Sequence, residues 1–84
     1  MWEYSVGQIV ESLDGHDKNG IFIVKECSDE FVYLVDGKIR KLGNPKKKKK
    51  KHVRFLSESS VEINDKTLDA EIRKCLKGFV NDSK

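Results

Sequence analysis

The chain has 84 residues, of which 37% are apolar and 37% charged, so it can form one domain with a small core and a heavily charged surface. Its longest apolar runs have four or five residues, far too few for a membrane-spanning helix. No basic and apolar stretch typical of a signal peptide stands at the N-terminus, and we therefore expect a cytoplasmic protein. The two cysteines, Cys27 and Cys75, lack the paired spacing of a metal site, and we expect both to be reduced.

The net charge of +3 conceals an uneven distribution along the chain. Residues 1–43 carry five Lys or Arg against eight Asp or Glu, and residues 57–84 carry five against six. Residues 44–56 (NPKKKKKKHVRFL) carry seven Lys or Arg and no acid, including the six consecutive lysines Lys46 to Lys51. Such a basic block is typical of an interaction surface, because a surface that only confers solubility intersperses the two signs.

Short apolar runs separated by turn residues predict a mainly β fold in the first two thirds of the chain. Aspartate, glycine and asparagine in residues 13–20 (LDGHDKNG) favour tight turns, and Asp36-Gly37 between two strand-like runs is a hairpin signal. The expected strands are residues 6–12, 21–24, 31–35, 38–42 and a fifth that begins at residue 53. About five short strands with tight connections predict a small barrel, which leaves few exposed edges.

After residue 64 the apolar residues recur with the period of a helix. Their spacings of four, three and one predict a C-terminal amphipathic helix over residues 65–80. We expect this helix to pack on a second apolar face outside the barrel, with a partner or a dimer interface as the alternative. The stripe consists of Leu68, Ile72, Cys75, Leu76, Phe79 and Val80. The expected organisation is a barrel over residues 1–56, a linker over 57–64 and then the helix.

Two stretches of the sequence resemble a known family. Gly7, Gly15, Lys18 and Gly20 lie between strand-like runs in the order of a KOW motif. The stretch VDGKIRKLGNPKKKKKKHV is similar to part of a group of bacterial KOW-domain RNA-binding proteins, which themselves resemble a large-subunit ribosomal protein of archaea and eukaryotes. The resemblance covers residues 5–55 well and the C-terminal tail weakly. It implies an SH3-like barrel of the translation-protein type and RNA binding, without establishing which RNA. The expected partner is structured RNA, and ribosomal RNA and ribosomal proteins are the candidates.

Two groups of residues are the candidates for contact with RNA. In the KOW loop, glycines can adopt positive φ and bring backbone amides close to phosphate oxygens, whereas the alternative is that they only close a hairpin. Basic side chains, one of them in the KOW loop, supply charge for the phosphate backbone. The loop glycines are Gly15 and Gly20, and the basic set is Lys18, Arg40, Lys41, Lys46, Lys47, Lys48, Lys49, Lys50, Lys51, His52 and Arg54.

Strand geometry limits what the lysine run can do. In an extended chain successive side chains alternate between faces, so Lys46, Lys48 and Lys50 are expected on one face and the other three on the opposite face. With cations from the rest of the set, roughly four to six phosphate contacts follow, and a slope of log affinity against log salt of about −3 to −5. The alternative is a solvated loop without a partner. We expect that replacing all six lysines by serine and glycine removes most RNA affinity and leaves the barrel folded.

Four aromatic residues are further candidates for base stacking. Phe31 and Tyr33 are expected in the core, whereas Trp2 and Tyr4 precede the first strand and are equally suited to stacking or to covering an open barrel end. His16 and Asp17 are interpreted as turn residues. Neither His16 nor His52 has the companion ligands that a metal site needs.

Three functions remain in competition. The first is a non-catalytic, monomeric RNA-binding protein that works on or near the ribosome, with A-form shape as its main selector. The second is a protein-interaction adaptor that uses the barrel or the helix, and the third is a polyanion binder without RNA preference. We expect no enzyme and no cofactor, because the sequence contains no nucleophile–base pair, no phosphate-loop motif and no metal cluster.

Overall fold

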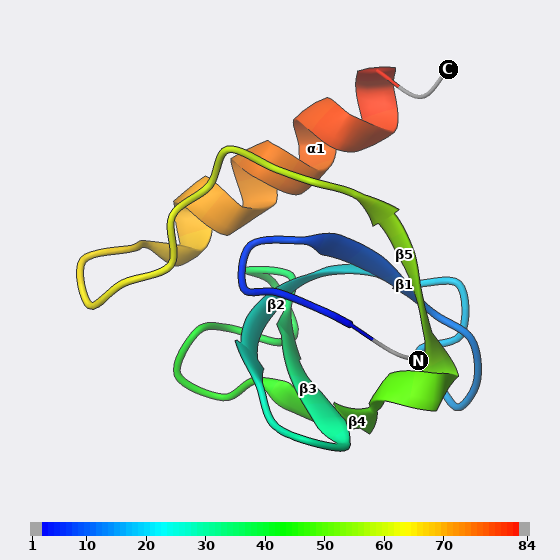
Figure 1. The fold of residues 1–84 in the computed structure, drawn as a ribbon. Helices are drawn as coiled ribbons and strands as arrows, with labels where there is room; N and C mark the ends of the chain where they lie inside the picture. Colours follow the sequence, from blue (N-terminus) through cyan, green and yellow to red (C-terminus); the bar gives the residue numbers. More distant parts are fainter. Residues whose placement is uncertain (1–2, 83–84) are drawn as a thin grey trace.

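The computed structural model describes residues 3–82, in which five antiparallel strands form one open sheet and a helix follows. The strands lie in the order β4-β3-β2-β1-β5 and curl around a common interior, with the helix on one side (Figure 1). The elements are β1 (Ile9–Ser12), β2 (Ile21–Cys27), β3 (Phe31–Val35), β4 (Lys46–Lys49), the short 3-10 helix η1 (Lys50–His52), β5 (Val53–Ser57) and α1 (Asp69–Asp82). The predicted fold class, mainly β with a C-terminal helix, is confirmed, and the sheet is consistent with a small SH3-like barrel.

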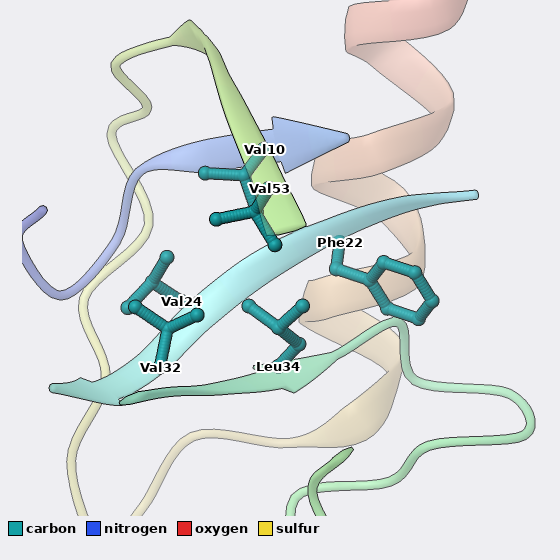
Figure 2. Packing of buried hydrophobic residues seen from close by; sticks show 6 residues of the cluster. All are labelled: Val10, Phe22, Val24, Val32, Leu34 and Val53. Carbon is teal, nitrogen blue, oxygen red and sulfur yellow. The ribbon is translucent and has the colours of Figure 1, made fainter. Parts of the chain in front are cut away.

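The inner face of the sheet forms the first hydrophobic core. Alternate residues of four strands point toward one another there, and each apolar side chain that is removed from water contributes about 1.5–3 kcal/mol (Figure 2). Its buried members are Val10, Phe22, Val24, Val32, Leu34 and Val53. Tyr4 packs against this core and its hydroxyl donates to the carbonyl of Val53 at 2.9 Å, so Tyr4 covers the barrel interior and is not a free stacking ring.

A second core lies between the outer face of the sheet and α1. It joins Ile9, Ile23 and Val35 of the strands with Ile72 and Leu76 of the helix. The helix begins at Asp69, four residues after the predicted start, and Leu68 lies outside it with 62% of its surface exposed. The barrel therefore has apolar residues on both faces of its central strands, one set for the interior and one for the helix.

The prediction of a strand over residues 38–42 is wrong, because the Asp36 side chain organises this segment as a loop. Its carboxylate accepts hydrogen bonds from the backbone N–H groups of Lys38 and Arg40, both at 2.9 Å. The Arg40 carbonyl in turn accepts from the N–H groups of Asp36 and Gly37, and Gly37 has a φ of +78°. A side chain that satisfies local amides competes with a ladder of strand hydrogen bonds. The fourth strand is instead formed by the lysines.

The segment predicted as a linker is packed against the rest of the molecule. The Ser59 hydroxyl donates to the carbonyl of Gly7, and Val61 and Ile63 pack against the second core. Gly7 has a φ of +94°, which explains why the first strand begins at Ile9 rather than at residue 6. The path from β5 to α1 is thus tied to the rest of the molecule at Ser59, Val61 and Ile63, whereas residues 64–66 are exposed.

Candidate nucleic-acid interface

Four of the six consecutive lysines form β4, the edge strand of the sheet. The strand pairs with β3 in antiparallel register, with Tyr33 opposite Lys47 and Val32 opposite Lys48. Side chains alternate along it, so Lys47 and Lys49 are exposed on the outer face whereas Lys48 is buried on the inner face with 8% of its surface exposed. The alternation ends at Lys49, because η1 begins at Lys50.

Lys48 is held by two aspartates of the β1–β2 loop. Its ammonium lies 2.8 Å from Oδ1 of Asp17 and 3.1 Å from Oδ1 of Asp14, and it donates to the Asp14 carbonyl at 2.9 Å. The buried Ser12 hydroxyl donates to Oδ1 of Asp17 at 2.8 Å, and Nδ1 of His52 lies 3.2 Å from Oδ2 of Asp14. We call these five residues the aspartate–lysine network. It ties β4 and η1 to the β1–β2 loop across the mouth of the barrel.

The network shifts the pKa values of both ion-pair partners toward the charged forms. Burial by itself lowers the pKa of Lys48, but the hydrogen bonds and negative charges of Asp17 and Asp14 outweigh it, so the pKa is raised. Burial likewise raises the pKa of Asp17, but the hydrogen bonds from Lys48 and Ser12 and the charge of Lys48 lower it further than burial raises it. The pair is therefore charged and internally compensated at neutral pH.

The aspartate–lysine network contains two of the predicted RNA-contact residues, Lys48 and His52. Lys48 is a structural residue with its charge already paired, and His52 is directed toward Asp14. Replacing all six lysines would therefore also break a buried ion pair and is not a test of binding alone. Asp17, interpreted from the sequence as a turn residue, is the principal partner of Lys48.

The outer face of β3 and β4 combines aromatic and cationic side chains. Phe31 and Tyr33 are half-buried and belong to neither hydrophobic core, contrary to the prediction that they are core residues. They stand opposite Lys49 and Lys47 in the register, and the Lys47 ammonium lies 4.3 Å from the centre of the Phe31 ring. None of the described residues forms a salt bridge with Lys47, Lys49, or the η1 lysines.

Three predicted cations from separate parts of the chain line one pocket. Lys18 comes from the β1–β2 loop, Arg40 from the loop after β3, and Lys46 from the start of β4. The pocket has a volume of about 460 Å³, and its lining also contains Phe22, Ile39 and the two acidic residues Asp17 and Asp36. Ile39 exposes 84% of its surface at the tip of its loop. The predicted cooperation of the KOW-like loop with the lysine run is thus geometrically feasible at Lys46.

The two glycines of the β1–β2 loop have different roles. Gly15 has a φ of +80°, as expected for a glycine-dependent turn. Gly20 does not adopt positive φ; Asn19 does, with a φ of +71°. The Gly20 N–H donates to the Asp17 carbonyl at 2.8 Å and is not free for a phosphate, while a Cβ at this position would lie 2.9 Å from the Phe22 ring. Gly20 thus serves packing rather than anion binding.

The remaining candidates lie apart from these groups. Arg54 stands on β5, at the opposite edge of the sheet, and its Nε donates to Glu11 at 3.1 Å. Lys41 is exposed in the loop after β3 and does not line the pocket. Trp2 lies outside the described residues. The predicted set therefore divides into four groups. The outward lysine group consists of the exposed Lys47, Lys49 and Lys51 with the half-buried Lys50, and the pocket group consists of Lys18, Arg40 and Lys46. Lys48 and His52 are internally paired, and Arg54 and Lys41 are two peripheral cations.

A second basic surface lies beside the helix. A groove of about 790 Å³ between α1 and the loop after β3 has apolar side chains in its lining and four cations. The apolar residues are Ile21, Leu76 and Val80, the cations are Lys38, Arg73, Lys74 and Lys77, and Asp36 is the acidic residue of the lining. Arg73 also donates to the Gly37 carbonyl at 2.6 Å, which fixes the helix against that loop.

Within residues 3–82 no group of three or more His, Cys, Asp or Glu side chains is arranged to hold a metal ion, and both cysteines are free thiols. No helix in this part of the chain is long and apolar enough to cross a membrane. In comparisons with known proteins, the chain matches no family model and no curated protein sequence.

Proposed function

We propose that the protein is a non-catalytic RNA-binding protein that holds the phosphate backbone with its outward lysine group and its pocket group. The observation that carries this proposal is the ordered display of unpaired lysines on an edge strand, while the one inward lysine of β4 is compensated internally. The chain thus neutralises Lys48 and leaves its neighbours available to a ligand.

Electrostatics favours a polyanion as that ligand. Lysines that project from one short strand and the adjoining turn repel one another, and this repulsion destabilises the compact state until anions relieve it. A chain of phosphates does so at several positions at once and releases its own counterions. Lysine contacts phosphate as a point charge without reading bases, so the surface is suited to backbone binding rather than to sequence recognition.

The resemblance of residues 5–55 to KOW-domain proteins supports RNA as the polyanion and the ribosome as its location. On this reading the protein acts in the cytoplasm as a monomer, and structured RNA, including ribosomal RNA, is its partner. The barrel supplies rigidity, because the aspartate–lysine network fixes β4 to the loop that carries Lys18.

The decisive experiment replaces the outward lysine group by serine and retains Lys48. Fluorescence anisotropy with a labelled RNA hairpin should show a loss of affinity on the order of 100-fold. This estimate assumes that each of the four lysines contributes somewhat less than about 1 kcal/mol to the binding free energy. For the wild type, the slope of log affinity against log salt between about 50 and 200 mM should be roughly −3 to −6, depending on how many of the pocket cations contribute. The variant's slope should be smaller by about 3.

A charge-matched control removes four exposed lysines from elsewhere: Lys38, Lys66, Lys74 and Lys77. This control has the same net charge as the test variant, so general attraction to a polyanion changes equally in both. Equal losses of affinity in the two variants would contradict the proposal. Equal wild-type affinity for duplex DNA, RNA and anionic vesicles would instead identify a polyanion binder without RNA preference.

The groove beside α1 favours a second candidate function, that of a protein-interaction adaptor. Its apolar lining with a cationic rim is complementary to an acidic peptide with apolar side chains. If this surface is the functional one, partners should be captured from extracts after ribonuclease treatment, and Lys74→Glu with Lys77→Glu should abolish the capture. Loss of every partner upon ribonuclease treatment would exclude the adaptor function.

A further inference from the structure

We propose that the outer face of β3 and β4 is a stacking platform for unpaired RNA bases, with Tyr33 and Phe31 beneath the bases and the β4 lysines beside the phosphates. This inference rests on the proposed function and deepens it, because it names single-stranded RNA as the form bound at this face. The platform consists of Phe31, Tyr33, Lys47 and Lys49.

The strand register places these four side chains on one surface. Residues that are directly opposite in an antiparallel pair share a face, and the pairs are Tyr33 with Lys47 and Phe31 with Lys49. The intervening Val32 and Lys48 are buried on the inner face. Two aromatic residues of β3 therefore lie beside two lysines of β4 on the outer surface at this edge of the sheet.

The helix leaves this part of the outer face uncovered. Val35 lies on the same face of β3 as Tyr33 and is fully buried in the core beneath α1. Phe31 and Tyr33, farther along the strand, belong to no core cluster, and α1 lies on the opposite side of the molecule from β4 (Figure 1). Phe31 and Tyr33 are thus partly exposed, although α1 covers another part of the same outer face.

The charges on either side of Tyr33 give the platform a direction. Across β4 its neighbour is Lys47, and across β2 its register partner is the exposed Glu26. Phosphates are attracted to the lysine side and repelled from the carboxylate, so the backbone should follow β4 and the base should lie over β3. The Lys47 ammonium occupies one face of the Phe31 ring, so a base stacks on that face only when Lys47 turns toward a phosphate, and Tyr33 is the principal stacking residue.

The geometry selects unpaired bases. In a duplex the faces of the bases are stacked on one another, so a ring on a flat protein surface can stack only on a base that is splayed out of a single strand, loop or end. Stacking on aromatic side chains tolerates every base, because each has a π face. The platform therefore favours single-stranded RNA over duplex RNA and favours no base sequence. The lysines contribute the backbone contacts in addition.

The test compares three probes of about 12 nucleotides by anisotropy: oligouridine, an abasic ribose-phosphate chain of equal length, and an RNA duplex. The wild type should bind oligouridine about fivefold to a hundredfold more tightly than the abasic chain. Tyr33→Leu should remove most of that difference, and Phe31→Leu should reduce it. Tyr33→Phe keeps the ring and should bind within about twofold of the wild type.

Affinity for the abasic chain is the internal control, because it reports the lysine contacts alone. If the wild type binds oligouridine and the abasic chain equally while both interactions weaken with salt, the platform is refuted and the proposed function stands. If none of the three probes binds, both are refuted. The wild-type comparison needs no variant, so it decides the matter even if Tyr33→Leu is destabilised.

Discussion

Replacing Lys48 by methionine separates the one buried lysine of β4 from its exposed neighbours. Methionine retains an unbranched apolar stem of similar length, so the packing of the side chain is largely preserved while the ammonium is lost. The change removes the contacts to Asp17 and Asp14 at 2.8 and 3.1 Å and the hydrogen bond to the Asp14 carbonyl at 2.9 Å.

The cost follows from the exposure of the partners that remain. Removing one member of a fully buried ion pair costs about 3–5 kcal/mol, because the other charge is left uncompensated. Here the side chains of Asp14 and Asp17 are 49% and 23% exposed, so water screens part of that loss. We therefore expect the free energy of unfolding to fall by about 2–3 kcal/mol, and Tm by roughly 10–20 °C.

Urea denaturation at neutral pH, followed by far-ultraviolet circular dichroism, measures this effect. The matched control is Lys49→Met, an exposed neighbour on the same strand, for which the free energy of unfolding should change by less than about 0.5 kcal/mol. Lys49→Met should weaken RNA binding, and Lys48→Met should affect binding only through its loss of stability. Equal denaturation midpoints for the two variants would refute the structural role of Lys48.

Three further outcomes are expected. The unfolding free-energy difference between wild type and Lys48→Met should be largest between the ordinary pKa values of 3.8 for Asp and 10.5 for Lys. This difference should become smaller as the pH falls through the lowered pKa of Asp17, and also as the pH rises through the raised pKa of Lys48. Urea denaturation at several pH values measures it, and a difference that does not change with pH would contradict a stabilising role of the pair. Gly37→Ala should lower the free energy of unfolding by about 2 kcal/mol or more, because φ is +78° at this position and a Cβ would lie 2.5 Å from the Asp69 carbonyl. An unchanged urea midpoint would contradict this expectation. Ile72→Ala, at a fully buried position, should cost about 2–5 kcal/mol by the same measurement, and a loss below about 1 kcal/mol would contradict tight packing of α1.

The fold class was predictable from the sequence because the short apolar runs and the helical stripe are local signals. The hairpins β1–β2 and β2–β3 follow directly from turn residues between apolar runs. The fourth strand was not predictable in this way. Residues 38–42 have a strand-like composition, but the Asp36 side chain accepts hydrogen bonds from the backbone N–H groups of Lys38 and Arg40. These local hydrogen bonds replace strand pairing, and the composition of the segment alone does not predict them.

The candidate site was predictable in its composition and not in its orientation. The lysine run identified the basic surface, and alternation predicted that about half of the lysines face each side. Which side is buried depends on the partner strand and on a loop more than thirty residues away in the chain, where Asp17 meets Lys48. A long-range pair of this kind has no local signature.

The aromatic side of the site shows the same limit. The run FVYLV reads as a strand buried on both faces, and its inner residues Val32 and Leu34 are indeed in the core. Alternation alone would have placed Phe31 and Tyr33 together on the other face. Whether that face is covered depends on how far α1 extends over the sheet, and of the β3 residues only Val35 belongs to the core beneath α1.

The central claim, that the outward lysine group holds RNA, is tested most directly by an NMR titration of the ¹⁵N-labelled protein with an RNA hairpin that has an unpaired loop. The largest chemical-shift changes should cluster at Lys47, Lys49 and the η1 lysines and extend to Lys18 and Arg40, while the helix groove is unaffected. Changes confined to Lys74 and Lys77 beside α1, or no changes at all near β4, would contradict the account.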